Sequence, residues 1–161
     1  MEVSEMTTLE EFVREVDERI VQIFNEAGVV HAMWHIIPRE GKEIFFPSPT
    51  VRNKSVLDKV MRACFERIDV VRFAYISEAW TLTGADDDEL NDAMLTGLRD
   101  HPDRVEILCY TAEDEMGRVL GIRPIIREEG EKPRLGPLTV ERTKYDEGRF
   151  VGMLPARGRT Q

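Results

Sequence analysis

Apolar residues recur with the period of an α-helix in the first part of the chain. Thr8 and Glu11 form a capping box before this stripe, and Gly28 follows it at the position where many helices end in a left-handed residue. The pattern predicts an amphipathic helix over residues 9–27. Its apolar stripe consists of Leu9, Phe12, Val13, Val16, Ile20, Ile23, Phe24 and Ala27.

After Gly28 the period of the apolar residues changes to two. Residues 29–37 alternate along a predicted strand, and both of its faces are largely apolar, which is typical of a strand buried on most of its area. Residues 38–42 contain proline and glycine. They predict a turn into a short second strand over residues 43–46.

A second amphipathic helix and a long strand follow. Between residues 56 and 68 the apolar positions return to helical spacing, with Thr50 or Asn53 available as the N-cap. Residues 70–82 are rich in β-branched and aromatic side chains. The length of this stretch predicts a strand that crosses the centre of a sheet.

The next elements are a short helix and a hairpin. A loop over residues 84–89 leads into a third helix over residues 90–98. Residues 104–112 and 118–127 then predict a β-hairpin. Pro124 in its second arm indicates an edge position or a bulge, because proline lacks the backbone N–H that a strand ladder requires.

The predicted order is helix, strand, strand, helix, strand, helix, strand and strand. It indicates an α+β fold, with a mainly antiparallel sheet packed by two amphipathic helices. We interpret residues 1–127 as a single α+β domain and residues 128–161 as a Gly/Pro-rich basic extension, docked on the domain or on a neighbour. Residues 135–140 and 150–154 of this extension are apolar islands that form late strands or docking segments.

The composition fits one folded domain. The chain has 161 residues, of which 42% are hydrophobic and 33% charged, so it can bury a substantial core. Its apolar stretches are far shorter than the ~18 residues of a membrane helix, and acids near the N-terminus do not fit a secretory signal. Cys64 and Cys109 lie in apolar runs, as buried thiols do in a reducing compartment. We therefore expect a cytoplasmic protein with no membrane partner.

Charge is divided unevenly along the chain. Residues 1–117 carry 12 Lys and Arg against 25 Asp and Glu, net −13, whereas residues 118–161 carry 10 against 6, net +4, giving −9 overall. Opposite charges steer association, so we expect the basic segment to dock on an acidic surface of its own chain or of another protein. The acidic total argues against nucleic acid as the partner.

His31 and His35 have the i, i+4 spacing of a zinc-binding helix, but the glutamate that follows the first histidine in that motif is missing. On a strand their Cα atoms lie roughly 13 Å apart, at about 3.3 Å per residue. This separation is too long for one metal ion with ligand bonds of about 2.1 Å. We predict no metal site and keep the two histidines as lesser candidates for acid–base catalysis.

Glu78 is the third lesser candidate for catalysis. It shares a strand face with Arg72, Ile76 and Trp80, and a partly buried carboxylate near an arginine can have a shifted pKa. The same pattern fits a structural ion pair or a strand end that reaches solvent, and we favour that interpretation.

Familiar catalytic and cofactor motifs are absent from the sequence. There is no G-x-S-x-G elbow and no G-x-x-x-x-G-K-[ST] or G-x-G-x-x-G phosphate loop. The acidic runs at residues 86–89 and 113–115 lack the spacing of a calcium-binding loop. We predict no cofactor and no set of catalytic residues.

Arginines of the basic segment are the predicted binding residues. On alternate positions, Arg123 and Arg127 share a face of the hairpin arm with Val119 and Ile125, so a sheet edge would present their guanidinium groups to carboxylates or phosphates. The predicted binding set consists of Arg123, Arg127, Arg134 and Arg149.

Two functions are compatible with these patterns. The first, which we favour, is a non-catalytic protein-interaction or assembly module that forms a homo-oligomer through a sheet edge and the basic segment. The second is a small enzyme or ligand-binding domain with a pocket between sheet and helices. A polar-lined pocket beside Trp34 and Trp80 would support the second. Its residues would be Glu78, His31 or His35, and Arg123.

Overall fold

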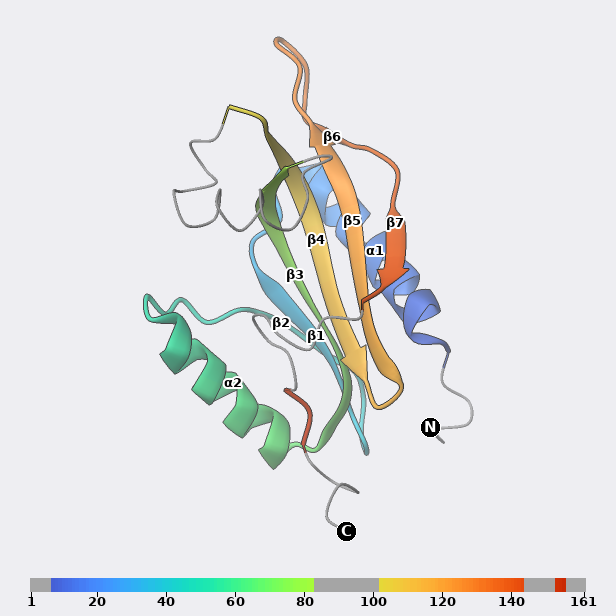
Figure 1. Ribbon diagram of the computed structural model, residues 1–161, viewed down its shortest axis with the longest axis vertical. Helices are drawn as coiled ribbons and strands as arrows, with labels where there is room; N and C mark the ends of the chain where they lie inside the picture. The colour runs from blue at the N-terminus through green and yellow to red at the C-terminus, as the bar shows by residue number, and fades with distance from the viewer. Residues whose placement is uncertain (1–6, 83–101, 144–152, 156–161) are drawn as a thin grey trace.

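The computed structural model describes residues 7–82, 102–143 and 153–155. In this part of the chain an antiparallel sheet of seven strands lies between two helices, α1 (Leu9–Ala27) on one face and α2 (Lys54–Arg67) on the other (Figure 1). The predicted α+β fold is confirmed, and the described elements follow the predicted order. The third helix, expected over residues 90–98, lies outside the described residues.

Helix α1, Leu9–Ala27, has the predicted bounds. Thr8 Oγ1 accepts a hydrogen bond from the Glu11 amide at 3.2 Å. Gly28 has a left-handed φ of 76°, and its N–H donates to the Phe24 carbonyl at 2.7 Å. Both ends of the helix are fixed by nearby residues, which is why the sequence predicts it correctly.

Helix α2, Lys54–Arg67, begins directly after Asn53. The Asn53 Oδ1 accepts hydrogen bonds from the amides of Ser55 at 2.9 Å and Val56 at 3.4 Å. Asn53, rather than Thr50, is therefore the N-cap.

The described strands pair in the order β2-β1-β3-β4-β5-β6, and β7 also pairs with β5. The long strand β3 crosses the middle of the sheet, as its length and composition predict (Figure 1). The strands are β1 Met33–Pro38, β2 Ile44–Pro47, β3 Val70–Leu82, β4 Arg104–Asp114, β5 Gly117–Ile126, β6 Arg134–Leu135 and β7 Thr139–Arg142.

Strand β1 starts at Met33, four positions later than residues 29–37 predict. Met33 pairs with Ile76 of β3, and a continued ladder would place Val30 beside the end of β3. The Val30 N–H instead donates to the Glu78 side-chain Oε1 at 2.9 Å. The Glu78 side chain therefore takes the place of a backbone partner for Val30. Alternation of nearby residues cannot predict this contact, because Glu78 is distant in sequence.

The predicted hairpin is present, but its first arm continues to Asp114 and its second arm runs from Gly117 to Ile126, one residue earlier than expected. Asp114 pairs with Gly117 at its tip, where Gly117 has a positive φ of 146°. On the outer side of β5, β7 pairs as far as Ile122 and β6 begins to pair at Ile125. Pro124 lies between these two partners, where no strand requires its missing N–H.

Two apolar cores lie on the two faces of the sheet. The first, under α1, includes Tyr110 and Ile125, and the second, under α2, includes the fully buried Trp34. Gly121 of β5 permits the close approach of α1, because an added Cβ would lie 3.0 Å from Val13 Cγ1.

The described part of residues 128–161 contributes to both cores. Leu135 of β6 and Val140 of β7 pack against the first core, and Met153, only 2% exposed, belongs to the second. Arg142 pairs with Glu10 in the first turn of α1 at 2.7 Å. These residues extend the sheet and help to close both cores, while the division at residue 127 stays a prediction.

Candidate functional site

The candidate site lies at one end of strands β3, β4 and β5. Trp80 of β3 pairs with Glu106 of β4. The chain leaving α1 is tied to Glu78 through the Val30 amide. Trp80 lies two positions further along the same face of β3 and is 37% exposed.

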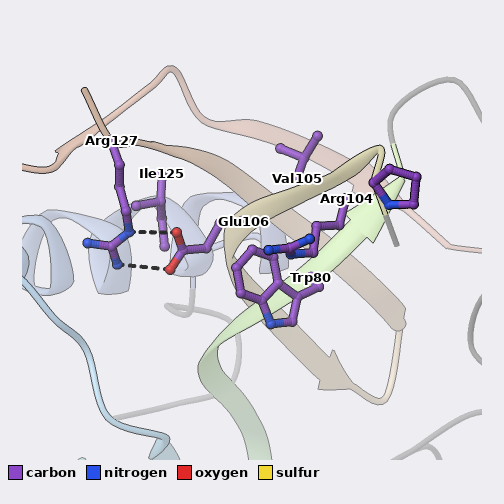
Figure 2. Close-up of a pocket in the computed structure, with 7 residues that line it drawn as sticks. Trp80, Arg104, Val105, Glu106, Ile125 and Arg127 are labelled. Atoms are coloured by element: carbon purple, nitrogen blue, oxygen red, sulfur yellow. Dashed lines mark hydrogen bonds and ion pairs between the residues drawn. The ribbon is translucent and has the colours of Figure 1, made fainter. Parts of the chain in front are cut away.

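A depression of about 400 Å³ opens beside Trp80 (Figure 2). This volume falls within the range of about 300–1,000 Å³ that is usual for ligand pockets. We call the surface the Trp80 patch. Its lining residues are Trp80, Pro102, Arg104, Val105, Glu106, Ile125 and Arg127.

Arg104 lies over the indole of Trp80. Its Cζ is 5.0 Å from the ring centroid, in a cation–π contact (Figure 2). Such contacts contribute about 0.5–1 kcal/mol at exposed sites. The contact places a cation directly beside the exposed aromatic ring.

Glu106 of β4 forms a bidentate ion pair with Arg127, the residue that follows β5. Arg127 Nε donates to Glu106 Oε2 at 2.6 Å, and Nη2 donates to Oε1 at 2.8 Å (Figure 2). The hydrogen bonds to Glu106 raise the pKa of Arg127, so its guanidinium group stays protonated. Arg127, one of the predicted binding residues, thus lines the patch together with a carboxylate.

The carboxylate of Glu78 makes a hydrogen bond that supports the fold. Its Oε1 accepts the hydrogen bond from Val30 and holds the connection between α1 and β1. This arrangement fits the interpretation that the carboxylate supports the fold.

The two histidines, His31 and His35, lie in different environments. His31 is exposed in the connection before β1, whereas His35 is buried. His35 Nε2 lies 2.8 Å from Glu43 Oε2, and the rings of Phe12 and Phe45 each pack edge-on at 5.4 Å. Burial lowers the pKa of His35, and the hydrogen bond with Glu43 opposes this only in part.

Arg123 is the centre of a polar network under α1. Its Nε and Nη2 bind the two carboxylate oxygens of Asp17 at 2.8 and 2.7 Å, and its Nη1 donates to the Gly136 carbonyl at 2.7 Å. Tyr110 donates its hydroxyl to Asp17 Oδ1 at 2.5 Å. Burial and Asp17 raise the pKa of Tyr110, which stays protonated as the donor.

The structure does not bring the predicted pocket residues together. His35 on β1 and Arg123 on β5 lie three strands apart, roughly 14 Å at about 4.8 Å per strand. Trp34 is buried in the α2 core, whereas Trp80 lies on the opposite face.

Other arginines of the basic segment also form ion pairs within the chain. Arg134 pairs with Glu128 at 3.0 Å, and Arg118 pairs with Glu113 at 3.2 Å. Arg149 lies outside the described residues. Arg134 and Glu128 both belong to the basic segment, whereas the pairs of Arg118 with Glu113 and of Arg142 with Glu10 join it to the acidic one. Part of the charge difference is therefore balanced inside one molecule.

Two components of these sites were not predicted from the sequence: Asp17 and the pairing of Trp80 with Glu106. Asp17 carried a detectable signal, because it follows Val16 within the apolar arc of the first helix. The pairing of Trp80 with Glu106 depends on the register between β3 and β4, and no local sequence pattern indicates that register.

Two searches of the described residues gave negative results. No group of three or more His, Cys, Asp or Glu side chains there is arranged to hold a metal ion. None of the helices in that part of the chain has the length and apolar character needed to cross a membrane. Comparison of the chain with protein-family models, curated proteins and solved structures found no match.

Proposed function

We propose that this protein is a non-catalytic protein-interaction module and that it binds its partner through the Trp80 patch. The observation that carries the proposal is the exposed Trp80 side chain in the lining of the depression, with Arg104 over its indole ring. Tryptophan and arginine are the residues most enriched at the energetic centres of protein interfaces.

The lining indicates the chemistry of the partner. Apolar side chains of Trp80, Val105 and Ile125 are combined with two arginines and one glutamate. A matching protein surface offers an apolar side chain to the depression and a carboxylate to Arg104.

The alternative function, a small enzyme or ligand-binding domain, has less support. Its candidates are engaged in separate contacts: Glu78 with the Val30 amide, His35 with Glu43, and Arg123 with Asp17. No common reacting position lies between them, since His35 and Arg123 are on distant strands.

We also propose a cytoplasmic location. Cys64 and Cys109 are free thiols, which fits a reducing compartment.

Site-specific photocrosslinking tests the proposed function. A photoreactive phenylalanine derivative replaces Trp80 in the native host, and in a matched strain it replaces Met116, an exposed apolar residue at the hairpin tip. We expect a defined protein adduct from position 80 only. The purified adduct partner should then bind the Met116→Ala variant and lose binding to Trp80→Ala. The proposal is wrong if position 80 gives no adduct, or if Trp80→Ala binds that partner as the wild type does.

A further inference from the structure

We infer that the partner at the Trp80 patch is a second copy of this chain, bound across a two-fold axis so that Arg104 of each copy pairs with Glu106 of the other. This inference rests on the proposed function, because it names the partner of the same surface. In such an interface the same patch is used twice, and each residue pair occurs twice.

Charge limits where two copies can meet. Each chain carries a net charge of −9, so most orientations bring acidic surfaces together. The lining of the Trp80 patch contains Arg104 and Arg127 beside the carboxylate of Glu106. A contact centred there can therefore set an arginine of one copy against the carboxylate of the other.

The patch carries both signs of charge beside an apolar group, and this makes it complementary to itself. Arg104 and Glu106 are both on β4, where Arg104 lies over Trp80 of β3 and Glu106 pairs with Arg127 (Figure 2). A two-fold rotation that stacks the two Trp80 side chains brings the cation of one copy toward the carboxylate of the other.

Glu106 retains the capacity for this contact. Each of its carboxylate oxygens accepts one hydrogen bond from Arg127, and a carboxylate offers about four acceptor sites. Its side chain is 18% exposed, so a guanidinium from outside can reach it. Arg104 of the second copy would complete a carboxylate held between two arginines.

The small patch predicts a weak dimer. Standard interfaces use roughly 20–30 residues on each side, far more than line this depression. We therefore expect a dissociation constant above about 1 µM, so that association is visible only in a concentration series.

Complementary charge reversals test the inference. Arg104→Glu alone and Glu106→Lys alone place like charges opposite each other in their own dimers, so each should dimerise at least about tenfold more weakly than the wild type. Mixed in equal amounts they should form a heterodimer, because the acid introduced by Arg104→Glu then faces the amine introduced by Glu106→Lys, while the unchanged Arg104 of one variant faces the unchanged Glu106 of the other. Light scattering coupled to size exclusion measures the mass of each sample up to about 1 mM protein. Arg62→Glu and Glu66→Lys on α2, on the opposite face, are the matched controls and should dimerise as the wild type does.

Three outcomes overturn the inference: a wild type that is monomeric at every concentration, reversals that dimerise normally, or a mixture that fails to restore the dimer while circular dichroism shows both variants folded. None of them removes the proposed function if position 80 still crosslinks to a different protein. Absence of any adduct at position 80, either with a second copy or with another protein, would remove both.

Discussion

The guanidinium of Arg123 holds both carboxylate oxygens of Asp17, with Nε–Oδ1 and Nη2–Oδ2 distances of 2.8 and 2.7 Å. The Asp17 side chain is 5% exposed, and this pair ties α1 to β5 through the middle of the first core. A predicted binding arginine is thus part of the contact that holds the longest helix on the sheet.

Asp17→Ala should destabilise the fold by about 3 kcal/mol, because it leaves the Arg123 guanidinium and the Tyr110 hydroxyl without their shared acceptor. Urea unfolding measures the loss. Glu18→Ala, at the exposed neighbouring position of α1, is the control and should change stability by less than about 0.5 kcal/mol. Equal effects of the two substitutions would contradict a structural role for the pair.

Tyr110→Phe should destabilise the fold less than Asp17→Ala does, by about 1 kcal/mol. Asp17 keeps both hydrogen bonds from Arg123 when the tyrosine hydroxyl is removed. The same unfolding experiment applies. A loss as large as that of Asp17→Ala would show that the hydroxyl, rather than the ion pair, dominates the network.

His35 makes stability depend on pH. Burial lowers the pKa of folded His35, so the unfolded chain binds the proton more readily. The stabilisation is complete above the unfolded pKa of about 6.5 and is lost as the pH falls through the lower folded value. His35→Phe should reduce the loss of unfolding free energy between about pH 7 and pH 5, while His31→Gln, at an exposed position, should retain it. If the unfolding free energy of His35→Phe depends on pH as that of the wild type does, His35 is not the source of the pH dependence.

Met153→Ala should destabilise the α2 side of the sheet by about 2 kcal/mol, because it removes a side chain that is 2% exposed in the second core. Thermal unfolding followed by circular dichroism measures the change. Met116→Ala, at a methionine that is 76% exposed, is the control. If both variants unfold at the same temperature as the wild type, the packing of Met153 in the second core does not contribute to stability.

Local patterns predict the parts of this fold that local residues determine. The capping box at Thr8 and Glu11, the apolar stripe and Gly28 define α1 without help from the rest of the chain. Alternation also places Arg123 correctly on the face of Val119 and Ile125, where α1 covers it.

Contacts between distant residues set the limits of such predictions. The start of β1 depends on the Val30 amide meeting Glu78, 48 positions away, and the partner of Arg123 is 106 positions away. The Trp80 patch likewise exists only because the β3–β4 register places Trp80 beside Glu106. Charge counting identifies acidic and basic segments, but it cannot say which pairs form within one molecule and which remain for a partner.

Sedimentation velocity of the wild type, Trp80→Ala and Met116→Ala over a concentration series tests the central claim most directly. The account predicts that the sedimentation coefficients of the wild type and Met116→Ala rise with concentration toward that of a dimer, while Trp80→Ala remains a monomer. Association of Trp80→Ala as strong as that of the wild type would contradict the claim that two copies bind each other through this surface.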